Sequence, residues 1–103
     1  MELPIMKQYM VDIDLPMDMN HEFMELIPRQ RARINKLLQQ GVIANYSLSS
    51  DRSRLWVTVN AVSEADVDAV LRTFPVARFI EWTIHELMFQ QNSTPFVLKM
   101  SLN

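Results

Sequence analysis

The sequence predicts an α+β domain in which a four-stranded antiparallel sheet carries two helices on one face. Three observations support this fold class. Two stretches have helical spacing and begin at capping residues, and four other segments alternate apolar with polar residues. These elements follow one another as strand, helix, strand, strand, helix, strand. That order is typical of the ferredoxin-like βαββαβ arrangement, with right-handed crossovers that place both helices on the same face.

The first half of the chain supplies one strand and one long helix. Alternation from Lys7 to Leu15 predicts the strand, which Pro16 ends because proline cannot donate to an interior ladder. The helix is expected to begin after Asn20, a good N-cap, and to stop at Gly41, which accepts the left-handed conformation. Pro28 lies inside this span and predicts a kink or a helix in two parts.

The second half supplies a hairpin, a short helix and a last strand. Alternation predicts strands at Val42–Ser49 and Arg54–Asn60, and the short polar segment between them predicts a hairpin. Ser63 is expected to cap the second helix, and Pro75 to stop it. The last strand is expected at Phe79–Phe89.

These elements divide the chain into three parts. Residues 1–5 are expected to form an N-terminal arm, residues 6–90 the ferredoxin-like domain, and residues 91–103 a C-terminal tail. The tail contains the apolar run Phe96–Met100 after a polar break, so we expect it to dock on a neighbouring subunit.

The composition excludes several classes of protein. With 49% hydrophobic and 21% charged residues, the 103-residue chain is not disordered, and a net charge of −2 gives no support for strong nucleic-acid binding. A chain with no cysteine has no disulfide framework or cysteine–zinc site, and one glycine excludes glycine-rich phosphate loops. We expect a cytoplasmic protein without a cofactor, a metal or a membrane segment.

Two helices leave the second sheet face uncovered. We expect that face to mix polar groups with Met10 and Trp56. A solvated face seldom carries a tryptophan, and an apolar core would not contain acidic residues. The mixture favours a face that is half-covered by a second subunit, the alternative being a solvated face of a monomer.

The motifs in these positions resemble those of muconolactone delta-isomerases. Residues 6–19, MKQYMVDIDLPMDM, are similar to the opening strand and turn of that family, and the resemblance extends over roughly residues 6–90. The helix end Leu38–Gly41, the helix start Val62–Ala65 and the pair Phe74-Pro75 match in place. The resemblance implies a dimeric α/β-barrel that assembles further into rings with clefts between subunits. It also implies a cofactor-free proton shift on an unsaturated lactone acid, which needs a general acid or base and a cationic group.

One position leaves two functions open. Gln30 stands where the family carries an acidic residue in the first helix, and glutamine does not take up a proton at neutral pH. One alternative is a cofactor-free isomerase that acts on a small organic acid or catabolic intermediate in an intersubunit cleft. The other is a non-catalytic ligand-binding or assembly domain on the same scaffold. By analogy of fold alone, a cofactor-free monooxygenase-like member of the wider dimeric barrel set is a third hypothesis.

The candidate catalytic residues are His85, Asp12 and Glu81. The fold places the strands of His85 and Asp12 side by side with both side chains on the uncovered face, where the carboxylate could orient the imidazole as a base. Glu81 is the second candidate base on this face. The alternative is that His85 is an ordinary surface or interface histidine.

The candidate substrate-binding residues fall into two groups. Trp56 and Tyr46 are expected to line an apolar pocket. Arg29, Arg33 and Gln30 lie on the first helix, where the arginines could hold a carboxylate. For the arginines, the alternative is an ordinary solvated helix face.

Overall fold

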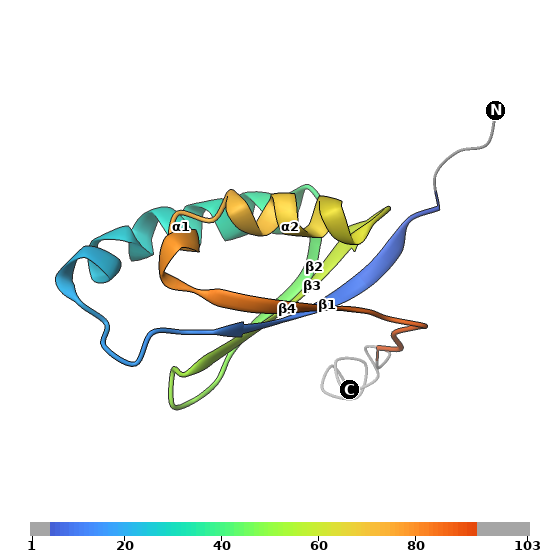
Figure 1. Cartoon of the computed structure of the whole chain (residues 1–103). Coiled ribbons are helices and arrows are strands. Elements are labelled where there is room, and N and C mark those ends of the chain that lie inside the picture. The colour runs from blue at the N-terminus through green and yellow to red at the C-terminus, as the bar shows by residue number, and fades with distance from the viewer. Residues whose placement is uncertain (1–4, 93–103) are drawn as a thin grey trace, which may run out of the picture.

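The computed structural model describes residues 5–92, and its elements follow the predicted order. The strands are β1 (Lys7–Asp14), β2 (Ile43–Leu48), β3 (Arg54–Ala61) and β4 (Glu81–Glu86). They pair antiparallel in the order β2-β3-β1-β4. The helices α1 (His21–Gln39) and α2 (Glu64–Arg72) lie on one side of this sheet (Figure 1). The predicted ferredoxin-like α+β fold is thereby confirmed.

Local signals determine where the helices begin and end. The Asn20 side chain accepts a hydrogen bond of 2.8 Å from the backbone N–H of Phe23, and the Ser63 hydroxyl accepts one of 3.2 Å from Asp66. Gly41 follows α1 with φ of 72°, the left-handed conformation that glycine adopts without steric conflict. The helix α1 runs without interruption through Pro28, so the two-part helix considered at this residue does not occur.

The strand β2 contains an irregularity that strict alternation does not predict. Ile43 pairs with Val59, whereas Asn45 pairs with the preceding residue of β3, Thr58, and the register shifts between them. Such a bulge inserts one residue and moves the following side chains to the other face. Ile43 is therefore buried under the helices, although simple alternation would place it on the same face as Asn45.

The start of the last strand was predicted too early. A 3-10 turn, η1 (Ala77–Phe79), occupies the residues before β4. The Phe79 ring meets the Phe23 ring of α1 edge-on, with 5.6 Å between the ring centroids. This aromatic contact under α1 replaces strand pairing at Phe79. The strand β4 also ends at Glu86, before the predicted end at Phe89.

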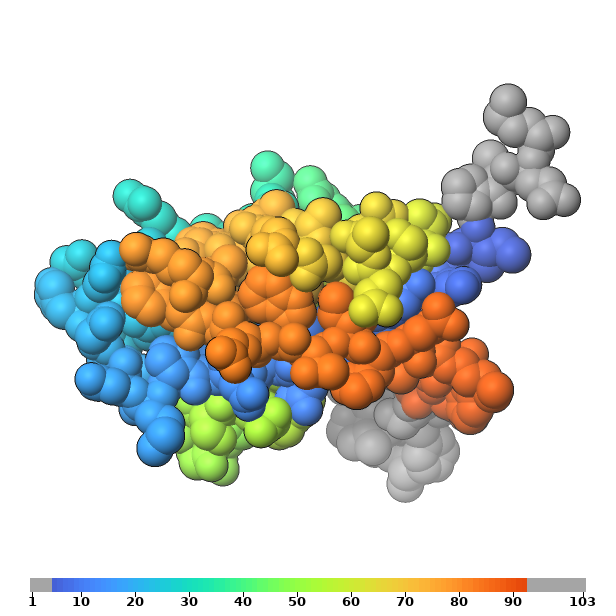
Figure 2. Space-filling view, in the orientation of Figure 1, coloured from blue at the N-terminus to red at the C-terminus, as the bar shows by residue number. Residues whose placement is uncertain are grey.

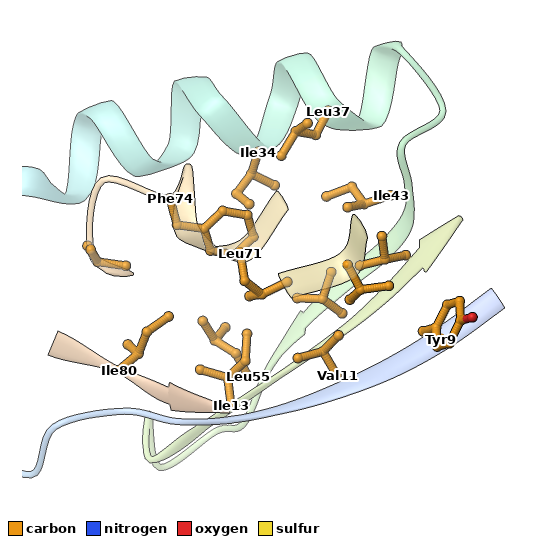
Figure 3. Close-up of a cluster of buried hydrophobic side chains, with 14 of the residues drawn as sticks. Tyr9, Val11, Ile13, Ile34, Leu37, Ile43, Leu55, Leu71, Phe74 and Ile80 are labelled. Carbon is orange, nitrogen blue, oxygen red and sulfur yellow. The ribbon is translucent and has the colours of Figure 1, made fainter. Parts of the chain in front are cut away.

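The core fills the space between the helices and the covered face of the sheet (Figure 3). Val11 and Ile13 of β1 and Val57 of β3 are fully buried, as is Leu71 of α2. The nearly buried Ile34 and Leu37 extend the core along α1. In the space-filling view, α2 lies directly over β4 along this edge of the sheet (Figure 2).

The structure does not describe the two ends of the chain, and two kinds of feature are absent from the part that it describes. The proposed tail segment Phe96–Met100 and most of the N-terminal arm lie outside the described residues. Within residues 5–92, no helix is long and apolar enough to cross a membrane. The same part of the chain contains no group of three or more His, Asp or Glu side chains arranged to hold a metal ion.

Candidate functional site

A pocket of about 290 Å³ lies between the first half of α1, the β2–β3 hairpin and the segment that follows α2. Figure 1 shows the start of α1 and the tip of the hairpin at the same end of the sheet. The pocket wall is mainly apolar and includes Phe23 and Ile27 of α1 and Leu55 of β3. Pockets of this kind, apolar with a few polar groups, bind small molecules in many proteins.

Gln30 is the polar residue buried in this wall. Its side chain is 4% exposed. The amide oxygen Oε1 accepts a hydrogen bond of 3.4 Å from the backbone N–H of Val76. Because an N–H must face an oxygen, this bond fixes the orientation of the amide and assigns Nε2 to the other side. Gln30 Nε2 is buried and has no hydrogen-bond partner within the described chain. A buried donor without a partner destabilises a protein, and such groups are rare.

Tyr46 lies beside Gln30 in the same pocket. It pairs with Val57 in the sheet, which turns its side chain toward the helices. Burial raises the pKa of the Tyr46 hydroxyl above its usual value, and the neighbouring Gln30 amide opposes this rise. The two groups do not form a well-aligned hydrogen bond, since Gln30 Nε2 has no partner at hydrogen-bonding geometry. Tyr46 therefore stays protonated at neutral pH and presents a hydroxyl that can donate.

Two arginines complete the polar lining of the pocket. Arg31 comes from α1 and Arg52 from the β2–β3 turn. Neither side chain forms an ion pair with another described residue. The described lining contains no Asp, Glu or His. All four polar groups of the pocket can therefore donate hydrogen bonds, and two of them carry a positive charge.

Sequence reasoning identified part of this group. Gln30 and Tyr46 were predicted as binding residues, and the structure places them together in the pocket. Arg31 and Arg52 were missed. The burial of Gln30 is visible in the sequence, because positions 23, 27, 30, 34 and 37 form a stripe along one side of α1, and Gln30 is the polar member of that stripe.

The predicted catalytic residues lie on the opposite, uncovered face of the sheet. Asp12 stands opposite Thr83 and His85 stands opposite Met10, so the two are diagonal neighbours. Asp12 Oδ1 accepts a hydrogen bond of 2.7 Å from Arg54 and makes no hydrogen bond to His85. Arg54 also forms an ion pair of 3.0 Å with Asp14, which stands beside Glu81 in the sheet.

The remaining predicted binding residues are not brought together with this pocket. Trp56 pairs with Asp12 on the uncovered face, where its side chain is 38% exposed. Arg33 donates to the Thr73 hydroxyl at 3.0 Å and links α1 to the end of α2. Arg29 lines a separate surface depression. The candidate site of the folded chain is therefore the pocket around Gln30, and Trp56 belongs to a different surface.

The turn that carries Arg52 is held by a network of short polar contacts. Asp51 accepts hydrogen bonds of 2.7 Å from the hydroxyls of Ser49 and Ser53, and one of 3.0 Å from the Ser53 backbone N–H. These bonds favour the ionised carboxylate and lower the pKa of Asp51 to about 2.

Asp51→Asn is expected to lower the melting temperature at neutral pH and to lose this effect in acid. The folded pKa of about 2 lies below the ordinary value of 3.8, so the stabilising contribution is complete above pH 3.8 and disappears as the pH falls through about 2. Thermal melts of both proteins between pH 7 and pH 2 measure the difference. Asp18→Asn is the control, since its side chain makes none of these contacts, and a constant difference at every pH would contradict the assignment.

The comparisons with known proteins add no family to this geometry: no protein family matches the chain, and no curated protein matches it either. The resemblance to muconolactone delta-isomerases stays a prediction from the motifs.

Proposed function

We propose that this protein binds a small organic acid in the pocket between α1 and the β2–β3 hairpin. The observation that carries the proposal is the mainly apolar pocket whose polar groups all donate, among them the buried Nε2 of Gln30, which has no well-aligned hydrogen-bond partner within the described residues. A ligand with a hydrogen-bond acceptor would satisfy this donor. Binding such a ligand would recover the free energy that the unpaired donor costs the free protein.

The chemistry of the lining indicates the class of ligand. The apolar wall suits a hydrocarbon body, and a volume of about 290 Å³ suits a molecule of the size of a substituted benzoate. The hydroxyl of Tyr46 and the guanidinium groups of Arg31 and Arg52 all favour an oxygen acceptor, above all a carboxylate. The motif resemblance to a family that acts on lactone acids supports the same class.

The lining favours binding over proton transfer. General acid–base catalysis needs a group whose pKa lies near the working pH, and Tyr46 is shifted away from it. The candidate bases His85 and Glu81 stand on the other face of the sheet. We therefore propose the non-catalytic ligand-binding alternative in preference to the isomerase.

Titration with sodium 4-methylbenzoate tests this proposal. In two-dimensional NMR spectra, we expect saturable shifts of the Gln30 side-chain amide and of the backbone amides of Tyr46, Leu55 and Val76. Gln30→Met keeps the volume of the side chain and removes the donor, and it is expected to weaken binding about tenfold.

A matched variant separates this effect from a general loss of structure. Gln39→Met makes the same chemical change on the exposed last turn of α1, and it is expected to leave the affinity unchanged. Melting curves of both variants verify that they are folded. Shifts scattered over the surface would contradict the proposal. So would the absence of shifts in the pocket at about 10 mM ligand, a concentration high enough to detect weak specific binding.

We also propose that the uncovered sheet face pairs with a second copy of the chain, in the manner of a dimeric α/β-barrel. The support is the partly exposed Trp56 of β3 on a face that also carries charges of both signs, Arg54 beside Asp12 and Asp14. A face with both signs can be complementary to itself across a two-fold axis. Assembly into rings would extend this arrangement.

A further inference from the structure

The backbone at Arg52 adopts an unfavourable conformation. Its φ is 62°, and it is the one residue other than glycine with a positive φ in the part of the chain that the structure describes. In this region the Cβ atom crowds the neighbouring backbone, and glycine or asparagine usually occupies such positions. An arginine here gives no advantage to the turn itself.

The surrounding contacts force this conformation on Arg52. Its N–H donates to the Ser49 carbonyl at 3.0 Å, while the Ser49 N–H donates to the Arg54 carbonyl at 2.9 Å. The Ser53 carbonyl accepts a bond of 3.0 Å from the N–H of Leu15, which ties the turn to the end of β1. With the Asp51 contacts described above, the turn is fixed on both sides of Arg52. Strain that persists under such constraint is typical of functional positions.

The side chain of Arg52 lines the pocket together with Arg31. Two guanidinium groups border one small pocket, and the described lining contains no carboxylate to balance them. The chain as a whole carries a net charge of −2, so this local excess of positive charge is not a property of the whole surface. An anion between the two side chains would remove the imbalance.

We propose that Arg52 is the residue that makes the pocket selective for anions, and that the strained β2–β3 turn exists to present its guanidinium group to the ligand carboxylate. This inference rests on the proposed function and adds to it the group that distinguishes an acid from an uncharged molecule of the same shape. A guanidinium group binds a carboxylate through two parallel hydrogen bonds, which a neutral amide cannot match.

The test compares two ligands of the same shape, 4-methylbenzoate and 4-methylbenzamide, on wild type and on Arg52→Gly. Wild type is expected to bind the acid at least tenfold more tightly than the amide. Arg52→Gly is expected to lose most of this preference, since only Arg31 remains, and to keep its affinity for the amide. Because glycine accepts a positive φ, the same variant is expected to melt at a higher temperature than wild type.

Two further variants make the result specific. Arg52→Asn also tolerates the left-handed conformation and is expected to lose most of the preference for the acid. Lys36→Ala removes one positive charge from the exposed end of α1 and is expected to retain the preference, which excludes a mere effect of net charge. Affinities are measured by isothermal calorimetry, and melting temperatures by circular dichroism.

The outcomes separate the two proposals. If Arg52→Gly prefers the acid as strongly as wild type does, the role of Arg52 in selectivity is wrong, and if it melts below wild type, the strain inferred at the turn is wrong. The binding function stands in both cases. If wild type binds acid and amide equally, anion selectivity is wrong and the pocket remains a site for small molecules. If wild type binds neither ligand, both proposals are overturned.

Discussion

Replacing Leu71 by alanine is expected to lower the free energy of unfolding by about 2–5 kcal/mol. Leu71 is 0% exposed and lies where α2 faces the sheet (Figure 3). The change removes buried methyl groups and leaves a cavity that the packed neighbours fill only partly. Because a domain of this kind is stable by about 5–15 kcal/mol, the loss is a large share of the total.

Urea denaturation followed by circular dichroism measures this loss. Leu38→Ala is the matched control, since it makes the same change on α1 at a side chain that is 39% exposed. It is expected to cost less than about 1 kcal/mol, because less apolar surface leaves water there on folding. Equal losses in the two variants would mean that α2 does not pack on the sheet as described.

Trp56→Asp is expected to raise the dissociation constant of the proposed homodimer at least about 100-fold. The change removes a large apolar contact and places a charge without a partner in the interface. Asp12 and Asp14 already stand on this face, so a further carboxylate also adds repulsion. Sedimentation equilibrium of wild type and variant over a range of concentrations gives both constants.

The control for this experiment is Leu38→Asp. Leu38 has nearly the same exposure as Trp56, 39% against 38%, but it lies on α1, on the other side of the sheet. It is expected to leave the dimer intact. A wild-type protein that sediments as a monomer at micromolar concentration, or equal weakening by both variants, would exclude the sheet face as the interface.

The order and type of the elements could be predicted because their signals are local. Asn20 and Ser63 cap their helices through side-chain bonds to residues three positions ahead, so the sequence alone identifies them. The bulge at Ile43 and the 3-10 turn at Phe79 depend on partners far along the chain, namely Val59 of β3 and Phe23 of α1. Such partners are absent from any short sequence pattern.

The candidate site could likewise be predicted where its signals are local, and not where they depend on residues far along the chain. The stripe on α1 places Gln30 in the interior, and alternation along β2 brings Tyr46 to the same side. The role of Arg52 depends on a φ value and on a pocket that forms between three segments, neither of which has a sequence signature here. The hydrogen bond considered between Asp12 and His85 is not formed in the structure, where Asp12 accepts instead from Arg54, one strand away.

Pro28 gives the pocket wall a mechanical property. It stands on α1 between Ile27 and Gln30, which both line the pocket, and it lacks the N–H that would otherwise bond the carbonyl of Met24. With one fewer bond across this turn, the helix bends there at lower cost than elsewhere along its length. We therefore expect the pocket wall to bend outward more readily at this turn than elsewhere, while the second half of α1 stays anchored in the core through Ile34 and Leu37.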